Sequence, residues 1–274
     1  MRRLDALAVA GGLVVVATIV LAAAAPVLAP GDPIKNALLD RLTPPTWRGE
    51  HPLGTDTLGR DVASRLLHGA RVSLVVGFSA VLLAGVLGVV LGLVSGWYRG
   101  WLDDVVMRIG DVQLAFPVLV LAVGVLAVLG AGLLNLILVL SATGWITYAR
   151  IVRGEVLTLR ERDFVAAARA LGASDAWIVA RHLLPNVLPP ITVVATFSVA
   201  RTIIAEASLS FLGLGIPAPE PSWGAMLDEG RNYITTGWWL ALFPGLAILL
   251  LVLGINLVGD WLRDLLDPRL ERGL

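Results

Sequence analysis

The sequence predicts an all-α, polytopic membrane protein with six transmembrane helices, and two observations support this prediction. Of the 274 residues, 57% are hydrophobic and only 15% are charged, whereas a soluble domain carries roughly 25% charged residues. The apolar residues also gather in long stretches without Asp, Glu, Lys or Arg. These stretches are residues 6–31, 72–98, 112–149, 182–200 and 232–259.

The stretch over residues 112–149 is too long for one crossing. A single helix there would be about 57 Å long, whereas the hydrocarbon core of a bilayer is about 30 Å thick. Gly130-Ala131-Gly132 lies near its middle and predicts a turn. We therefore expect two short spans here, and six in all. The expected spans are one within residues 1–28 and five at about 73–97, 113–130, 133–149, 187–207 and 238–258.

The first stretch has an alternative interpretation as a cleaved signal peptide. Met1-Arg2-Arg3 would be its charged region and residues 22–25 its small residues. The apolar stretch exceeds the 7–15 residues of a signal-peptide core, which favours a membrane span.

The placement of arginine predicts the orientation, because cytoplasmic loops of membrane proteins are enriched in Lys and Arg. The segment over residues 150–186 is the most arginine-rich of the chain. We therefore expect this segment, both termini and the tail 261–274 to be cytoplasmic. Residues 29–71 and 208–231 would then face outward.

The outer segment 29–71 is proline-rich in its first half, which predicts an extended conformation. Asp56 or Thr57 could cap a following helix. Leu58, Val62 and Leu66 lie four residues apart and predict a short amphipathic helix, either lying at the membrane surface or packed on the bundle.

Glycines recur at intervals of four in the second predicted span. Gly88, Gly92 and Gly96 form overlapping small-xxx-small repeats, which allow two membrane helices to approach closely. Residues 98–111 are expected to form a short inner loop.

The cytoplasmic segment 150–186 predicts two helices joined by a glycine. Residues 164–171 are rich in alanine and favour a helix, which Gly172 would end. Ser174 can cap a second helix over residues 175–184, and Pro185 would stop it. A row of alanines permits close docking into another protein, but the same pattern also suits a hairpin packed on its own bundle.

Several chemistries are excluded by the residues that are missing. The only lysine, Lys35, does not follow a glycine, so the phosphate-binding loop G-x-x-x-x-G-K-[ST] is absent. There is no cysteine, and the three histidines, His51, His68 and His182, are scattered over both sides of the predicted topology, so no metal site is expected. Zero net charge argues against nucleic-acid binding. We expect a protein that is not an enzyme.

Two charges fall in or near the fifth span. Arg201 and Glu206 are candidate pathway-lining residues, since intramembrane charge is costly and usually functional. Alternatively, Glu206 marks the end of the helix and the Arg201 side chain reaches the membrane surface. Five residues place them on different faces of a helix, so no intrahelical pair is expected.

The cytoplasmic segment resembles the motif E-A-A-x-x-x-G-x9-I-x-L-P of inner-membrane subunits of bacterial ABC importers. Ala166-Ala167-Ala168, Gly172, His182 and Leu184-Pro185 lie at its spacings. Two positions depart from it, because Ala166 replaces the glutamate and His182 replaces the isoleucine.

Further blocks resemble the C-type permease of dipeptide, oligopeptide and nickel ABC importers. The resemblance covers nearly everything after about residue 50. The blocks are residues 53–62 (LGTDTLGRDV), 69–74 (GARVSL), 210–215 (SFLGLG), 221–227 (PSWGAML), 256–260 (NLVGD) and 266–269 (LDPR).

This resemblance implies a type I ABC importer permease fold, with its core over residues 69–260, in the bacterial inner membrane. It implies a second permease, one or two types of cytosolic ATPase subunit that hold ATP and Mg²⁺, and an external solute-binding protein. This chain would bind no cofactor. The residues implied to couple it to the ATPases are Phe164, Ala166, Ala167, Ala168, Arg169, Gly172, Ala173, Ser174 and Pro185.

The implied function is uptake of dipeptides, oligopeptides or nickel complexes, driven by the ATPases through residues 160–185. Two alternatives remain at this point. One is a membrane scaffold or sensor that recruits a soluble partner through the same loop. The other is an ion-coupled secondary transporter, although its charge-free spans offer few buried acids.

Overall fold

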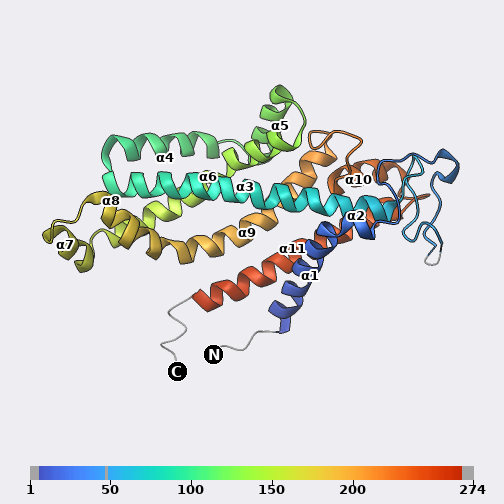
Figure 1. Cartoon of the computed structure of the whole chain (residues 1–274). Helices are drawn as coiled ribbons and strands as arrows, with labels where there is room; N and C mark the ends of the chain where they lie inside the picture. Colours follow the sequence, from blue (N-terminus) through green and yellow to red (C-terminus); the bar gives the residue numbers. More distant parts are fainter. Residues whose placement is uncertain (1–5, 47–48, 267–274) are drawn as a thin grey trace.

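The computed structural model describes residues 6–46 and 49–266, and these residues are mostly helical (Figure 1). The long helices are α1 (Ala6–Ala23), α3 (Val62–Tyr98), α6 (Leu133–Leu159), α9 (Leu184–Phe211) and α11 (Trp239–Leu266). Shorter helices are α2 (Ala25–Leu28), α4 (Gly100–Leu114), α5 (Val118–Leu129), α7 (Asp163–Ala170), α8 (Asp175–Ile178) and α10 (Trp223–Gly230). Residues 29–46 and 49–61 gather with α10 at one end of the molecule, and α7 and α8 lie at the other.

Five helices in the described ranges are long and apolar enough to cross a membrane, and a bent pair adds a sixth candidate. The bent pair is α4 and α5, which meet at 91°. An all-α membrane bundle with up to six spans is therefore present.

The third span differs from the straight helix expected over residues 113–130. Its first residues belong to α4, and the helix is interrupted just before Pro117. A proline disfavours helical geometry in the residue that precedes it. The remaining helix α5 has 12 residues and is about 18 Å long, so it cannot cross the hydrocarbon alone.

The inner loop expected over residues 98–111 is instead helix α4. The chain reverses at Arg99 and Gly100, both with positive φ (56° and 63°), and folds α4 back beside α3 and α6. Asp103 receives two hydrogen bonds from Arg153 of α6, at 2.5 and 2.6 Å. This bidentate pair holds α4 against the bundle.

The glycines of α3 let it lie directly against α6, as their spacing predicts. A Cβ on Gly92 would lie 2.7 Å from the Ala149 carbonyl oxygen, and one on Gly96 would lie 2.9 Å from Val156 Cβ. Gly88 faces the Trp145 carbonyl in the same way. The repeat therefore brings the backbones of α3 and α6 into direct contact.

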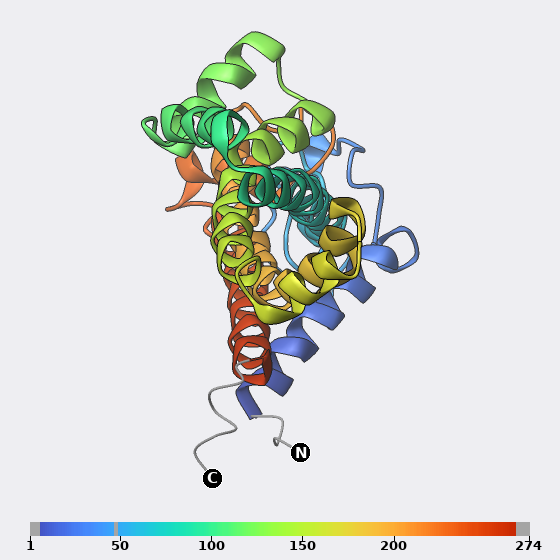
Figure 2. The ribbon, with the colours of Figure 1, turned by 90° about the vertical axis from the view of Figure 1, so that its left-hand side faces the viewer.

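Helix α1 packs on α11 through a second pair of glycines. A Cβ on Gly11 would lie 2.8 Å from the Gly254 carbonyl oxygen, and one on Gly254 would lie 2.9 Å from the Gly11 carbonyl oxygen. Figure 2 shows the two helices side by side below α3 and α6.

The outer segment does not contain the separate amphipathic helix that the stripe Leu58, Val62 and Leu66 predicts. Helix α3 begins at Val62 and continues through the span, while Leu58 lies in a turn. The cap is Asp61 rather than Asp56 or Thr57, because its carboxylate accepts the Ser64 backbone N–H at 2.7 Å.

Asp56 instead organises a buried ionic cluster. It is 1% exposed and accepts from the Leu58 and Arg60 backbone N–H groups at 2.8 and 2.9 Å. Arg60 and Arg65 both bind its carboxylate, at 2.7 and 2.5 Å, and both also bind Glu229 of α10. The cluster therefore ties residues 53–61 to α3 and α10.

We expect Asp56→Asn to lower the unfolding midpoint of the purified protein. The change leaves two buried guanidinium groups with one fewer anion, and breaking a buried pair costs about 3–5 kcal/mol. Asp32→Asn, at an exposed position, is the matched control. Equal midpoints for the two variants in a thermal melt would contradict the structural role of the cluster.

We expect Gly92→Ala to lower the unfolding midpoint as well, because its methyl group would meet the α6 backbone. The matched variant Gly124→Ala has open space around the added Cβ and should leave stability unchanged or raise it, since alanine favours a helix over glycine by about 1 kcal/mol. A stabilising Gly92→Ala would show that α3 and α6 do not need this contact.

Candidate coupling site and pathway residues

Helices α7 and α8 form a compact unit at one end of the bundle. Gly172 follows α7 with a φ of 83°, the left-handed conformation that suits glycine after a helix. The Ser174 hydroxyl accepts the Trp177 backbone N–H at 3.4 Å and caps α8. The predicted arrangement of helix, glycine and capped second helix is confirmed.

The predicted stop at Pro185 is wrong. The chain continues from α8 through a π-helical turn at Val179–Leu183 into α9, where Pro185 occupies the first turn. Pro185 has no N–H to donate to the preceding turn, and that turn is the π-helical one at Val179–Leu183. The exposed unit is thus joined without a break to a membrane-spanning helix.

Most of the predicted coupling residues are exposed. Phe164, Ala166, Ala167, Arg169, Gly172, Ser174 and Pro185 face solvent, Ala173 is half-buried, and Ala168 is buried at 8% exposure. Ala168 therefore packs inward beside Val165 and lies outside the exposed face.

Two large apolar residues of this face were missed from the sequence. Leu171 is 89% exposed and Trp177 is 49% exposed. Together with Phe164, at 40% exposure, they form what we call the apolar ridge. Only their place beside the alanine row could have suggested them, because an isolated Leu or Trp in a membrane sequence suggests a buried or lipid-facing position.

His182 lies between α7 and α8 and contacts an aromatic residue of each. Its ring lies 5.7 Å from Phe164 and 5.0 Å from Trp177, centroid to centroid. The imidazole at the position of the motif isoleucine thus contacts an aromatic ring of each helix.

Glu206 is completely buried between α3 and α9. It accepts hydrogen bonds from Ser73 at 3.0 Å and from Ser210 at 2.8 Å, and its exposure is 0%. These contacts join two helices, and they leave the carboxylate away from the exposed surface.

Arg201 lies apart from Glu206 on an exposed surface. Its guanidinium contacts the Ser198 hydroxyl at 3.3 Å, and it lines a cavity of about 160 Å³ with Thr143, Thr147 and Tyr148. The geometry thus suits Arg201, more than Glu206, to a polar pathway.

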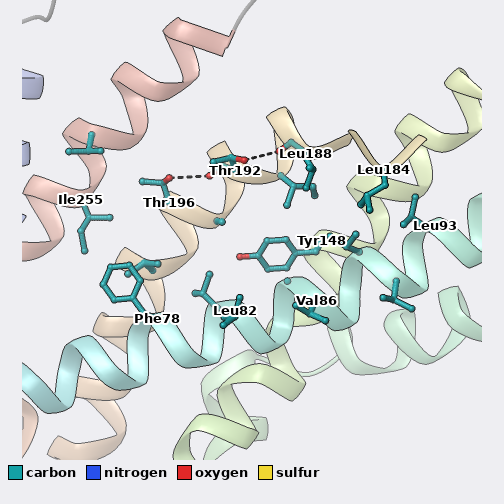
Figure 3. Close-up of a pocket in the computed structure, with 18 of the residues that line it drawn as sticks. Phe78, Leu82, Val86, Leu93, Tyr148, Leu184, Leu188, Thr192, Thr196 and Ile255 are labelled. Atoms are coloured by element: carbon teal, nitrogen blue, oxygen red, sulfur yellow. Dashed lines mark hydrogen bonds between the residues drawn. The ribbon is translucent and has the colours of Figure 1, made fainter. Parts of the chain in front are cut away.

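A larger and almost wholly apolar cavity of about 720 Å³ opens between α3 and α9 (Figure 3). Thr192 and Thr196 direct their hydroxyls back to helix carbonyls, at 2.8 and 3.0 Å, so they add little polarity. The Tyr148 side chain lies across the cavity, and its hydroxyl is buried. Tyr148 lines both cavities.

The architecture is shared with a solved importer. The MetNI methionine ABC transporter, in an inward-facing conformation, contains a chain that matches with a TM-score of 0.58 and 22% identity, covering 74% of this chain and 96% of that one. The fold is therefore that of an ABC importer permease.

Sequence comparison gives the family. Residues 88–272 match the model of the binding-protein-dependent transport system inner membrane component. The chain is 47% identical to a putative peptide transport system permease protein of Brucella suis, over 95% of this chain and 87% of that one. It is 44% identical to the di/tripeptide transport system permease protein of Pseudomonas aeruginosa, over 95% and 88%.

A glutathione transport system permease protein of Shigella dysenteriae is 47% identical over 81% of this chain and 73% of that one. The chain belongs to the family of binding-protein-dependent transport system inner membrane components. It is a multi-pass inner-membrane permease subunit of an ATP-driven importer, in a family of transporters rather than of catalytic enzymes.

We expect a cysteine in place of Arg201 to react with a water-soluble thiol reagent if Arg201 lines the pathway. The native chain has no cysteine, so an Arg201→Cys variant carries a single reactive group. In the assembled complex a charged, membrane-impermeant maleimide should label it, because a pathway surface is wetted. Leu249→Cys, at a 57% exposed apolar position of α11, should stay unlabelled. If neither cysteine variant reacts with the maleimide, Arg201 does not line the pathway.

Proposed function

We propose that this chain is the permease through which short peptides cross the inner membrane. It would pair with a second, similar permease. One or two types of cytosolic ATPase subunit, which bind ATP and Mg²⁺, would drive it, and an external solute-binding protein would deliver the peptide. Support comes from the relatives, which are named for peptide, di/tripeptide and glutathione transport.

The observation that supports coupling through α7 and α8 is the apolar ridge. Large apolar side chains rarely gather on a water-exposed end of a protein unless a partner covers them. The arginine-rich loop that carries them would be cytoplasmic by the charge rule, with both termini on the same side. An ATPase subunit is then the partner that this end of the permease meets.

The proposed cycle is one of alternating access. ATP would close the ATPase pair and move the α7–α8 unit. Since α8 continues into α9, that movement would reach the membrane without passing through a flexible loop. Arg201, beside Tyr148 and Ser198, would offer positive charge to carbonyl and carboxylate oxygens of a passing peptide.

The substrate is tested in vesicles that contain the whole complex and its binding protein. ATP-dependent uptake of a labelled dipeptide, with no uptake of nickel, is the expected result. Uptake of a nickel complex alone would overturn the peptide assignment. A complex that binds its partners but moves no solute would favour the scaffold or sensor alternative.

We expect Leu171→Glu to abolish ATP-driven uptake and co-purification of the ATPase subunits, with normal membrane levels of the chain. Leu171 is nearly fully exposed, so the change adds charge to the ridge without disturbing the core. Leu39 is at least as exposed as Leu171 and belongs to the segment 29–46 at the opposite end of the molecule, so Leu39→Glu should leave co-purification intact. Retained ATPase binding by Leu171→Glu would show that the ridge is not the docking surface.

A further inference from the structure

Helix α7, which follows α6 and is joined to α9 through α8, also contacts the end of α3. The guanidinium carbon of Arg169 lies 4.6 Å from the centroid of the Trp97 ring, near the end of α3. Trp97 is only 3% exposed. Figure 2 looks onto this end, where α7 and α8 lie beside the end of α3. An exposed helix is thus joined to a buried side chain of a membrane helix.

Arg160 holds the same tryptophan from the side of α6. It follows the last residue of α6, and its Nη1 donates to the Trp97 carbonyl at 2.8 Å and to the Gly96 carbonyl at 3.3 Å. Carbonyl groups in the last turn of a helix have no partner within the helix, and a cation there also suits the helix dipole. The Arg160 guanidinium carbon lies 5.9 Å from the ring.

The position of Trp97 suits it to transmit movement. It lies just before the reversal at Arg99 and Gly100, where α3 turns into α4. It also follows Gly96, whose contact with Val156 leaves no space between α3 and α6. A displacement at Trp97 therefore cannot be absorbed by a gap in local packing and must move α3 as a body.

We propose that Trp97 is a positioning residue that receives the movement of α7 through Arg169 and passes it to α3. This proposal rests on the coupling role given above to the α7–α8 unit, and it adds a second route beside the one through α9. A guanidinium over an aromatic face remains attracted as it slides across the ring. The contact can therefore persist while α7 shifts, with Arg160 holding the end of α3 on α6.

The test measures peptide transported per ATP hydrolysed by the whole complex in vesicles. Arg169→Gln removes the cation, and Trp97→Leu removes the ring. Each should lower this ratio by about fivefold, the equivalent of one lost cation–π contact, while ATP hydrolysis continues. Arg169→Lys and Trp97→Tyr keep the cation and the ring and should restore most of the ratio. The double variant should be no worse than either single variant, because both act on one contact.

Arg231→Gln is the matched control. It removes an arginine that lies 5.5 Å over Phe211 at the opposite end of the molecule, so transport per ATP should not change. If Trp97→Leu fails to assemble, Arg169→Gln decides the test, because Arg169 is exposed and its loss leaves the core intact.

Two outcomes separate this proposal from the coupling role it rests on. Unchanged transport per ATP in Arg169→Gln, together with loss of ATPase binding in Leu171→Glu, would overturn the role of Trp97 and leave the coupling surface standing. Normal uptake and ATPase binding in Leu171→Glu would overturn both.

Discussion

The close approach of α3 to α6 is the constraint on which the rest of the structure depends. Gly88, Gly92 and Gly96 present backbone rather than side chains to α6, and the two helices touch over several turns. In a membrane, where lipid tails remove most of the hydrophobic drive for helix association, such packing supplies much of the stability. Helices α4, α7 and α9 then attach to this pair through specific polar or aromatic contacts. These are Asp103–Arg153, Arg169–Trp97 and Ser73–Glu206.

Different kinds of interaction stabilise the two ends of the molecule. At the end that carries α10, the buried Asp56, Arg60 and Arg65 and the half-buried Glu229 form an ionic cluster that fixes loops without regular structure. Each of its charges has an oppositely charged partner and is hydrogen-bonded, which limits the cost of desolvation. At the other end, aromatic and arginine contacts hold helices whose outer faces stay open. One end of the molecule is therefore fixed by paired charges, whereas the end that carries α7 and α8 keeps an accessible face.

The sequence predicted features that depend on local chemistry. The glycine repeat, the positive φ of Gly172 and the Ser174 cap each follow from one residue type in one backbone geometry. Predictions that depended on tertiary context fared worse. Pro185 stands in a first helical turn rather than after a last one, because a π-helical turn precedes it. Residues 98–111 form α4 because Asp103 finds Arg153 on α6, a partner far away in sequence. Asp61, rather than Asp56, caps α3, while Asp56 is engaged by Arg60 and Arg65, which the distant Glu229 also binds.

Tertiary context also gives Arg201 and Glu206 different environments. Both are intramembrane charges in the sequence, yet Glu206 is enclosed between two serines and Arg201 is exposed, and no local pattern distinguishes these environments.

The helix that runs from Asp175 to Phe211 contains a joint. Pro189 and Pro190 have no backbone N–H, so the carbonyl groups of Pro185 and Asn186 lose their usual helical donors. The π-helical turn at Val179–Leu183 lies just before them. Beyond Pro190 the helix has no further proline up to Phe211. Such a helix can bend near its α8 end, where the ATPase would act, and stays stiff from residue 191 to Phe211. In the proposed cycle, a small rotation of α8 would swing the long stiff arm, which carries Arg201 along the 160 Å³ cavity.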